Sequence, residues 1–163
     1  FLPYLVGERT PHFDPGARGA FIGLTLAHGR GHAVRAIMEG VAFALRDSLE
    51  LMRALGPGPA EIVAAGGGGA GQPWQGILAS VFGLPVMTAS GPERTAAGAA
   101  LLAGLGAGLY AGPAEARARA VRYEPAVEPR PADAARYQEL YALYRELYPA
   151  LKQSSAILGQ ARD

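Results

Sequence analysis

The sequence predicts an α/β domain in which helices flank a short section of parallel sheet. Two short apolar runs, at 61–65 and 84–88, alternate with longer stretches that repeat with a helical period. Strand, helix, strand and helix in this order indicate parallel pairing, because parallel strands need a long crossover connection. So few short strands make a narrow sheet, and the chain begins with Phe1 instead of methionine. We therefore expect an incomplete sheet and a chain that is part of a longer protein.

The first third of the chain divides into a loop-rich segment and a long helix. Proline and glycine are dense over 1–31, which predicts loops with one short strand at 20–24. From about 32 to 55, apolar side chains recur at the spacing of one helix face, and Gly56 ends the helix. We expect His32 to lie at the start of this helix.

The rest of the chain is mainly helical between its short strands. Pro73 suits the first turn of a helix that Gly83 stops, and a helix rich in small residues follows at 95–109. The stretch 112–132 is a connection with at most one helical turn. The last helix is expected at about 133–151, and it carries tyrosines that we expect to pack against the domain, namely Tyr137, Tyr141, Tyr144 and Tyr148.

These elements make one domain followed by a short tail. The length of 163 residues suits a single ordinary domain. The domain is expected over residues 1–155. It consists of a loop-rich segment lining a cleft (1–31), an α/β core (32–110), a connection (111–132) and a terminal helix (133–152), and the tail is placed at 153–163.

Composition excludes several classes of function. The net charge of +1 argues against a nucleic-acid partner, and the absence of cysteine excludes disulfides and thiolate chemistry. Three histidines (His12, His28 and His32) give no basis for a metal cluster. No apolar run approaches the roughly 20 residues that span a bilayer. We expect a soluble cytoplasmic protein without a membrane partner, and a homodimer is left open.

A run of four glycines is the strongest local motif. It follows the apolar run 61–65 and precedes Gly71 and the helix that starts near Pro73. The N-terminus of a helix carries roughly half a positive charge, and glycines let an anion approach the backbone N–H groups. The strand, glycine loop and helix together favour a phosphate or nucleotide site. The alternative is that the glycines only permit a tight crossover between strand and helix.

The glycine run differs from one known phosphate motif and matches the spacing of another. A Walker loop is excluded, because no lysine follows the glycines. The dinucleotide pattern fits literally at Gly66, Gly68 and Gly71, but Glu93, the candidate ribose ligand, is separated from the preceding strand by Gly91 and a proline. A dinucleotide-binding (NAD) Rossmann-like domain and a non-catalytic structural domain therefore remain alternatives.

Three stretches together resemble the FGGY carbohydrate kinases and, within them, the xylulokinases. The three stretches are FLPYLVGERTPHFDPGARGAFIGL at 1–24, GGGGAGQPWQGILASVFGLPV at 66–86 and ERTAAGAALLAG at 93–104. His32 and the residues Ala-Ile-Met-Glu-Gly at 36–40 extend the first of them. The resemblance covers about 1–110. The sequence departs from the family at two positions. Gly69 stands where the family usually has alanine, and Ser80 stands where it often has aspartate.

The resemblance implies the C-terminal half of an actin/hexokinase-like (ribonuclease H-like) ATPase fold, with ATP bound between two domains. The implied reaction transfers the γ-phosphoryl group of ATP to D-xylulose or a similar ketose or polyol, with Mg²⁺ held mainly through the nucleotide and the missing N-terminal domain. The general base belongs to that domain, so no catalytic residue and no metal ligand is expected in this chain. The residues implied to bind the nucleotide are Gly66, Gly67, Gly68, Gly69, Gln72 and Trp74.

The first loop offers further polar residues. Glu8 and Arg9 lie in an irregular Gly/Pro-rich stretch, and we expect them to anchor the loop by ion pairing. His12 and Asp14 lie between prolines and suggest a turn. Glu39 lies on a mostly apolar helix, from which it could reach a cleft.

Overall fold

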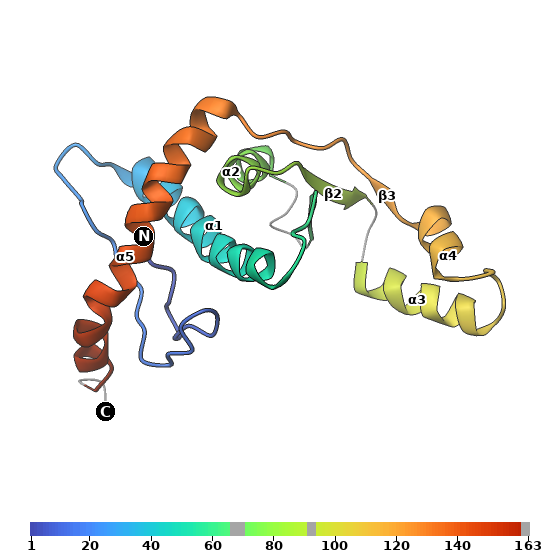
Figure 1. The fold of residues 1–163 in the computed structure, drawn as a ribbon, viewed down its shortest axis with the longest axis horizontal. Helices are drawn as coiled ribbons and strands as arrows, with labels where there is room; N and C mark the ends of the chain where they lie inside the picture. Colours follow the sequence, from blue (N-terminus) through green and yellow to red (C-terminus); the bar gives the residue numbers. More distant parts are fainter. Residues whose placement is uncertain (66–70, 91–93, 161–163) are drawn as a thin grey trace.

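The computed structural model describes residues 1–65, 71–90 and 94–160 (Figure 1). From the first helix onward, the predicted order of helices and strands is confirmed, with an additional short strand before the last helix. The elements are α1 (Arg30–Leu55), β1 (Ile62–Ala64), α2 (Gln72–Phe82), β2 (Val86–Ser90), α3 (Arg94–Gly106), α4 (Pro113–Ala120), β3 (Arg122–Tyr123) and α5 (Pro131–Gln160).

The strands form one small mixed sheet in the order β1-β2-β3. β1 and β2 pair in parallel, with Ile62 opposite Val86, and α2 is the crossover between them. β3 pairs antiparallel with the end of β2, where Tyr123 lies opposite Ala89. The predicted parallel section is therefore confirmed, whereas β3 is too short to give a periodic signal. α3 and α4 lie together at one end of the molecule, away from α1 and α5 (Figure 1).

The strand predicted at 20–24 is wrong. Only Ala20 pairs, through an isolated antiparallel bridge in which the Leu2 N–H donates to the Ala20 carbonyl at 2.9 Å and the reverse bond measures 3.1 Å. Gly23 adopts a left-handed conformation with φ of 78°, which turns the chain before a strand can extend. Phe21 and Ile22 remain partly exposed as a result.

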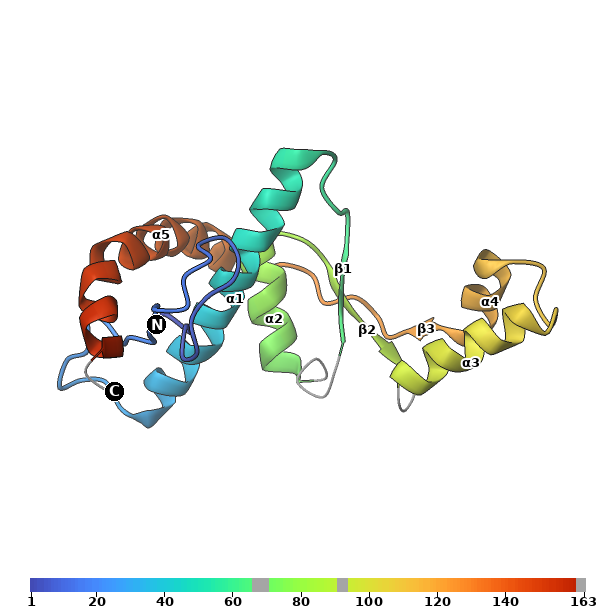
Figure 2. The same ribbon diagram turned by 90° about the horizontal axis from the view of Figure 1, so that it is seen from below.

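The last helix is longer than its pattern predicts. α5 continues to Gln160, so the segment predicted as a tail from residue 153 begins as helix. Pro149 lies inside α5, where its ring and missing N–H disturb the helical hydrogen bonds without ending the helix. Figure 2 shows α5 bending around the N-terminal segment. The expectation of at most one helical turn within the connection is wrong, because α4 is a helix of eight residues, which is about two turns.

The core lies where α1 and α2 meet α5, and the tyrosines of α5 are central to it. All four are at most 8% exposed, which confirms that they pack against this domain. Phe43 of α1 lies beneath three of them, with ring centroids 5.9 Å from Tyr137, 5.9 Å from Tyr141 and 5.3 Å from Tyr144. Such aromatic pairs add to the stabilisation from buried area alone.

Each tyrosine hydroxyl also fixes α5 to another part of the chain. Tyr137 donates to Glu39 at 2.7 Å and Tyr141 donates to Asp47 at 2.6 Å, both on α1. The remaining two hydroxyls reach the first loop, where Tyr144 contacts Tyr4 at 3.1 Å and Tyr148 donates to Asp14 at 2.7 Å. Buried hydroxyls need such partners, so this set fixes the register of α5 against α1 and the loop.

Gly40 permits a close crossing between α1 and the start of the chain. A Cβ built on Gly40 would collide with the carbonyl oxygen of Phe1. Alanine usually stabilises a helix interior by about 1 kcal/mol relative to glycine, but here we expect Gly40→Ala to lower the free energy of unfolding by about 1–3 kcal/mol. Gly76 of α2 has open space around it, so Gly76→Ala should instead raise stability by about 0.5–1 kcal/mol. Urea unfolding of both variants tests this, and a gain in stability for Gly40→Ala would contradict the crossing.

Candidate nucleotide site

The predicted site lies where β1 is joined to α2. Gly66, Gly67, Gly68 and Gly69 fall outside the described residues, but both flanks of the run are described. Ala65 follows the end of β1, and Gly71 is the N-cap of α2. The predicted order of strand, glycine run and helix is therefore confirmed.

The first turn of α2 has no side-chain cap. Gly71 provides no side-chain cap, Pro73 occupies the first turn, and this turn contains no acidic residue. A helix N-terminus carries backbone N–H groups without intrahelical partners and the positive end of the helix dipole. This end of α2 can therefore accept a phosphate or the polar groups of a nucleotide.

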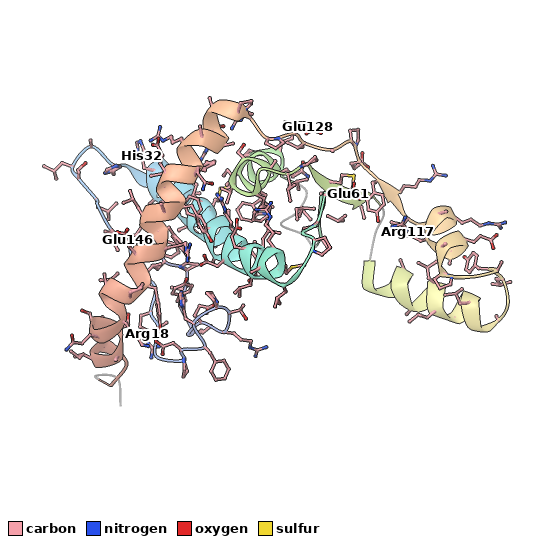
Figure 3. The ribbon with its side chains drawn as sticks, in the orientation of Figure 1. Arg18, His32, Glu61, Arg117, Glu128 and Glu146 are labelled. Atoms are coloured by element: carbon pink, nitrogen blue, oxygen red, sulfur yellow. The ribbon has the colours of Figure 1, made fainter. Side chains whose placement is uncertain are left out.

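Gln72 is exposed and lines a cavity of about 460 Å³ between α2 and the segment that precedes α5. Glu128, Arg130 and Arg35 line the same cavity. Figure 3 shows Glu128 on the connection that passes α2. Arg35 forms an ion pair with Glu39 at 2.6 Å, and its hydrogen bond to Glu39 raises the pKa of Arg35. Arginine is charged at any physiological pH, so Arg35 is a paired cation beside the cavity.

Trp74 lies on the opposite side of α2. It is half-buried and lines an apolar cavity of about 470 Å³ together with Leu45 and Met52 of α1 and Val63 of β1. Side chains two residues apart on a helix do not face each other, which explains why Gln72 and Trp74 line different cavities. The structure does not bring these two residues together, and their roles in binding stay predictions.

The sequence does not indicate that charged residues lie beside Gln72. Arg130 and Glu128 belong to a stretch interpreted as a plain connection, yet they lie beside the start of α2. The backbone N–H of Arg130 donates to the Oγ of Ser80 at 3.2 Å, and Ser80 is 2% exposed. This bond fixes the connection against α2. No local signal indicates it, because the two residues are 50 positions apart.

The first loop is anchored differently from the prediction. The expected ion pairing of Glu8 and Arg9 is wrong within the described chain, because the Glu8 carboxylate accepts the backbone N–H groups of Thr10 at 2.8 Å and His12 at 3.0 Å. A carboxylate that caps its own turn gains two charge-assisted hydrogen bonds without ordering a long arginine side chain.

The start of α1 follows the prediction more closely. His32 lies in its first turn, where the ring Nδ1 accepts the Gly29 N–H at 3.2 Å. Its place at the helix start is therefore confirmed. Together with Glu39 and Tyr137, His32 lines a cavity of about 410 Å³. Glu39 already contacts Arg35 and the Tyr137 hydroxyl there.

Asp14 gives the attachment of the first loop a dependence on pH. The hydrogen bond from Tyr148, helped by the Gly16 N–H, holds the pKa of Asp14 below its usual range. A depressed pKa stabilises the folded chain above the ordinary pKa of aspartate, and this stabilisation is lost as the pH falls through the folded value. We expect Tyr148→Phe to raise the pKa of Asp14, measured by carboxyl NMR, while Tyr123→Phe on β3 leaves it unchanged. An unaltered pKa in Tyr148→Phe would contradict this role.

Two further properties concern only the part of the chain that the structure describes. None of its helices combines the length and the apolar character needed to cross a membrane. Its acidic and histidine side chains nowhere gather in a group of three that could hold a metal ion.

Comparison with known proteins places these features in a family. Residues 1–107 match the C-terminal domain of the FGGY family of carbohydrate kinases. The chain is 37% identical over 162 residues to the xylulose kinase of Bacillus subtilis, covering 99% of this chain and 32% of that protein. It is 43% identical over 108 residues to the xylulose kinase of Escherichia coli, covering 66% of this chain and 22% of that protein.

Solved structures agree with the sequence matches. A ligand-bound xylulose kinase from Lactobacillus acidophilus superposes with a TM-score of 0.88 at 33% identity, covering 96% of this chain and 32% of that one. A xylulose kinase from Rhodospirillum rubrum gives a TM-score of 0.81 at 37% identity, covering 94% and 30%. The chain thus spans about a third of the length of these relatives. The predicted actin/hexokinase-like fold, present as its C-terminal part, is confirmed, and the chain belongs to the FGGY family of carbohydrate kinases.

Proposed function

We propose that this chain is the nucleotide-binding part of a sugar kinase that transfers the γ-phosphoryl group of ATP to D-xylulose or a similar ketose or polyol. The observation that carries the proposal is the uncapped N-terminus of α2, which follows β1 and the glycine run in a chain of the FGGY family. The identity with xylulose kinases, which extends over nearly the whole chain, supports this choice of substrate class.

The proposed contribution of this chain is to bind the adenosine side of ATP. The backbone of Gly66–Gly69 approaches the nucleotide, Gln72 offers an amide for hydrogen bonding, and Trp74 supports the loop from the apolar side of α2. Phosphoryl transfer depends mainly on positioning and on neutralising the charge of the phosphates. Mg²⁺ acts on those phosphates, and the sugar and the general base belong to the remaining two thirds of such a kinase. The reaction takes place in the cytoplasm in this proposal.

A hybrid enzyme tests the proposal. The matching third of the Bacillus subtilis xylulose kinase is replaced by this chain, and ATP-dependent phosphorylation of D-xylulose is measured. We expect activity in the hybrid and none in the chain alone, because the chain supplies only one side of the site. Phosphorylation of D-xylulose by the isolated chain would contradict the proposal, as would a folded hybrid that binds D-xylulose but no ATP.

A further inference from the structure

Arg35 lies on α1 at the boundary between two cavities. One is the cavity beside Gln72, and the other is the cavity of about 410 Å³ that His32 lines, between the first loop, α1 and α5. Arg35 lines both, and among the residues that the structure describes the two cavities share no other lining residue. A ligand that extends from the Gln72 cavity into the His32 cavity therefore passes the guanidinium of Arg35.

The guanidinium of Arg35 is held from two helices. Its Nε donates to Oε1 of Glu39 on α1 at 2.6 Å, and its Nη2 donates to the Tyr137 hydroxyl on α5 at 2.6 Å. The Tyr137 hydroxyl donates to the same oxygen of Glu39 at 2.7 Å, which closes a ring of three hydrogen bonds. Nη1 has no such partner in the described part of the chain, and the side chain is 47% exposed. Arg35 is therefore oriented before a ligand arrives, with one nitrogen left to bind it.

The two histidines of the His32 cavity act as hydrogen-bond donors toward a ligand. The Nδ1 of His28 accepts the backbone N–H of Thr25 at 2.9 Å, and the Nδ1 of His32 accepts that of Gly29 at 3.2 Å. A backbone N–H can only donate, so the proton of each neutral ring is at Nε2. Each ring is therefore left with an N–H group for a ligand.

The acidic groups of the His32 cavity are already paired. Glu39 contacts Arg35, and Asp133 forms an ion pair with Arg130 at 2.7 Å. Arg136 is exposed and forms no ion pair within the described ranges. A cation is repelled by these guanidinium groups, whereas the oxygens of a phosphate can accept from several N–H donors at once. The cavity next to Gln72 thus favours an anion.

We propose that Arg35 discriminates nucleotides from nucleosides by donating from Nη1 to the phosphate nearest the ribose, and that Glu39 and Tyr137 are positioning residues that orient Arg35 for this contact. This inference rests on the proposed function, because the nucleoside has to lie beside Gln72 for its phosphate to reach Arg35. The Tyr137 hydroxyl then serves binding as well as packing.

Calorimetric titration of the full chain with ATP and with adenosine tests the proposal. We expect Arg35→Gln to weaken ATP binding roughly tenfold and to change adenosine binding by less than about twofold, because only ATP carries the phosphate. Tyr137→Phe keeps the buried ring but removes the hydroxyl that holds Nη2, and it should weaken ATP binding severalfold with the same selectivity. Arg35→Lys keeps the charge without the planar fork, so it should recover only part of the affinity.

Arg53→Gln is the matched control. Arg53 also lies on α1 and forms an ion pair with a glutamate, Glu50 at 3.0 Å, but it lines neither cavity. Its substitution should leave the affinities for ATP and adenosine unchanged. A loss of ATP affinity equal to that of Arg35→Gln would show that any broken ion pair on α1 has this effect, and it would overturn the proposal.

The remaining outcomes separate this proposal from the proposed function. Weaker ATP binding in Arg35→Gln and Tyr137→Phe, with adenosine binding retained, supports the role of Arg35. Equal weakening of ATP and adenosine overturns it, because a purely structural role acts on both ligands, and nucleotide binding by the chain then still stands. No binding of ATP to the unmodified chain overturns both proposals. Inorganic phosphate is the third probe, and binding that Arg35→Gln weakens while ATP affinity stays unchanged indicates a separate anion site and overturns the contact with the nucleotide.

Discussion

Phe43→Ala is expected to lower the free energy of unfolding by about 3–5 kcal/mol, because it removes the ring that joins α1 to α5. Phe43 is 5% exposed, and the rings of Tyr137, Tyr141 and Tyr144 lie 5.3 to 5.9 Å from its own. An alanine would leave a void beneath these tyrosines, and their hydroxyl partners limit how far α5 can move to fill it. Urea unfolding followed by circular dichroism measures the change.

Phe13 provides the matched control for this substitution. Its side chain is 82% exposed at the tip of the first loop. Phe13→Ala should therefore change stability by no more than about 0.5 kcal/mol. Equal losses in the two variants would show that the interface between α1 and α5 is not the centre of the core.

The double substitution Gly67→Val/Gly68→Val is expected to weaken ATP binding by roughly a hundredfold. Each lost hydrogen bond to a charged group is worth about 1.5–3 kcal/mol. A valine side chain blocks the approach of a phosphate or ribose to the backbone and disfavours the positive φ angles that glycine permits. The two glycines lie outside the described residues, so the expectation depends on the uncapped start of α2 that follows them.

Gly56→Val is the control for those two substitutions. Gly56 follows α1 in extended backbone, with φ of 171° and open space where a Cβ would lie. Valine is therefore tolerated there, and ATP affinity should not change. Calorimetric titration with ATP compares the variants. Unchanged affinity in the Gly67→Val/Gly68→Val chain would favour the alternative that the glycines only permit a tight crossover.

Local patterns predict much of this fold. The apolar stripe of α1, the glycine that stops α2 and the short apolar run of β1 each carry their own signal, and the structure has all three elements. The strand expected at 20–24 fails because a short apolar run does not reveal that Gly23 turns the chain. The expected helix at 133–151 already contains Pro149, and the length of α5 was underestimated at its other end, because the stretch 152–160 carries little apolar periodicity.

The candidate sites are less accessible to sequence reasoning. The glycine run is local, and its position between a strand and a helix was predictable from its neighbours. The cavity beside Gln72 joins Arg35 with Glu128 and Arg130, and only the folded chain brings these distant residues together. The contact between Arg35 and Tyr137 likewise carries no local signal, because the two residues are 102 positions apart.

Calorimetric titration of the unmodified chain with ATP and, separately, with NAD⁺ tests the central claim most directly. The strand, the glycine run and the uncapped N-terminus of α2 fit both nucleotides in principle, and membership of the FGGY family favours ATP. We expect ATP to bind to one saturable site and NAD⁺ to bind more weakly or not at all. Tighter binding of NAD⁺, or no binding of either nucleotide, would contradict the assignment of this chain as the ATP-binding part of a sugar kinase.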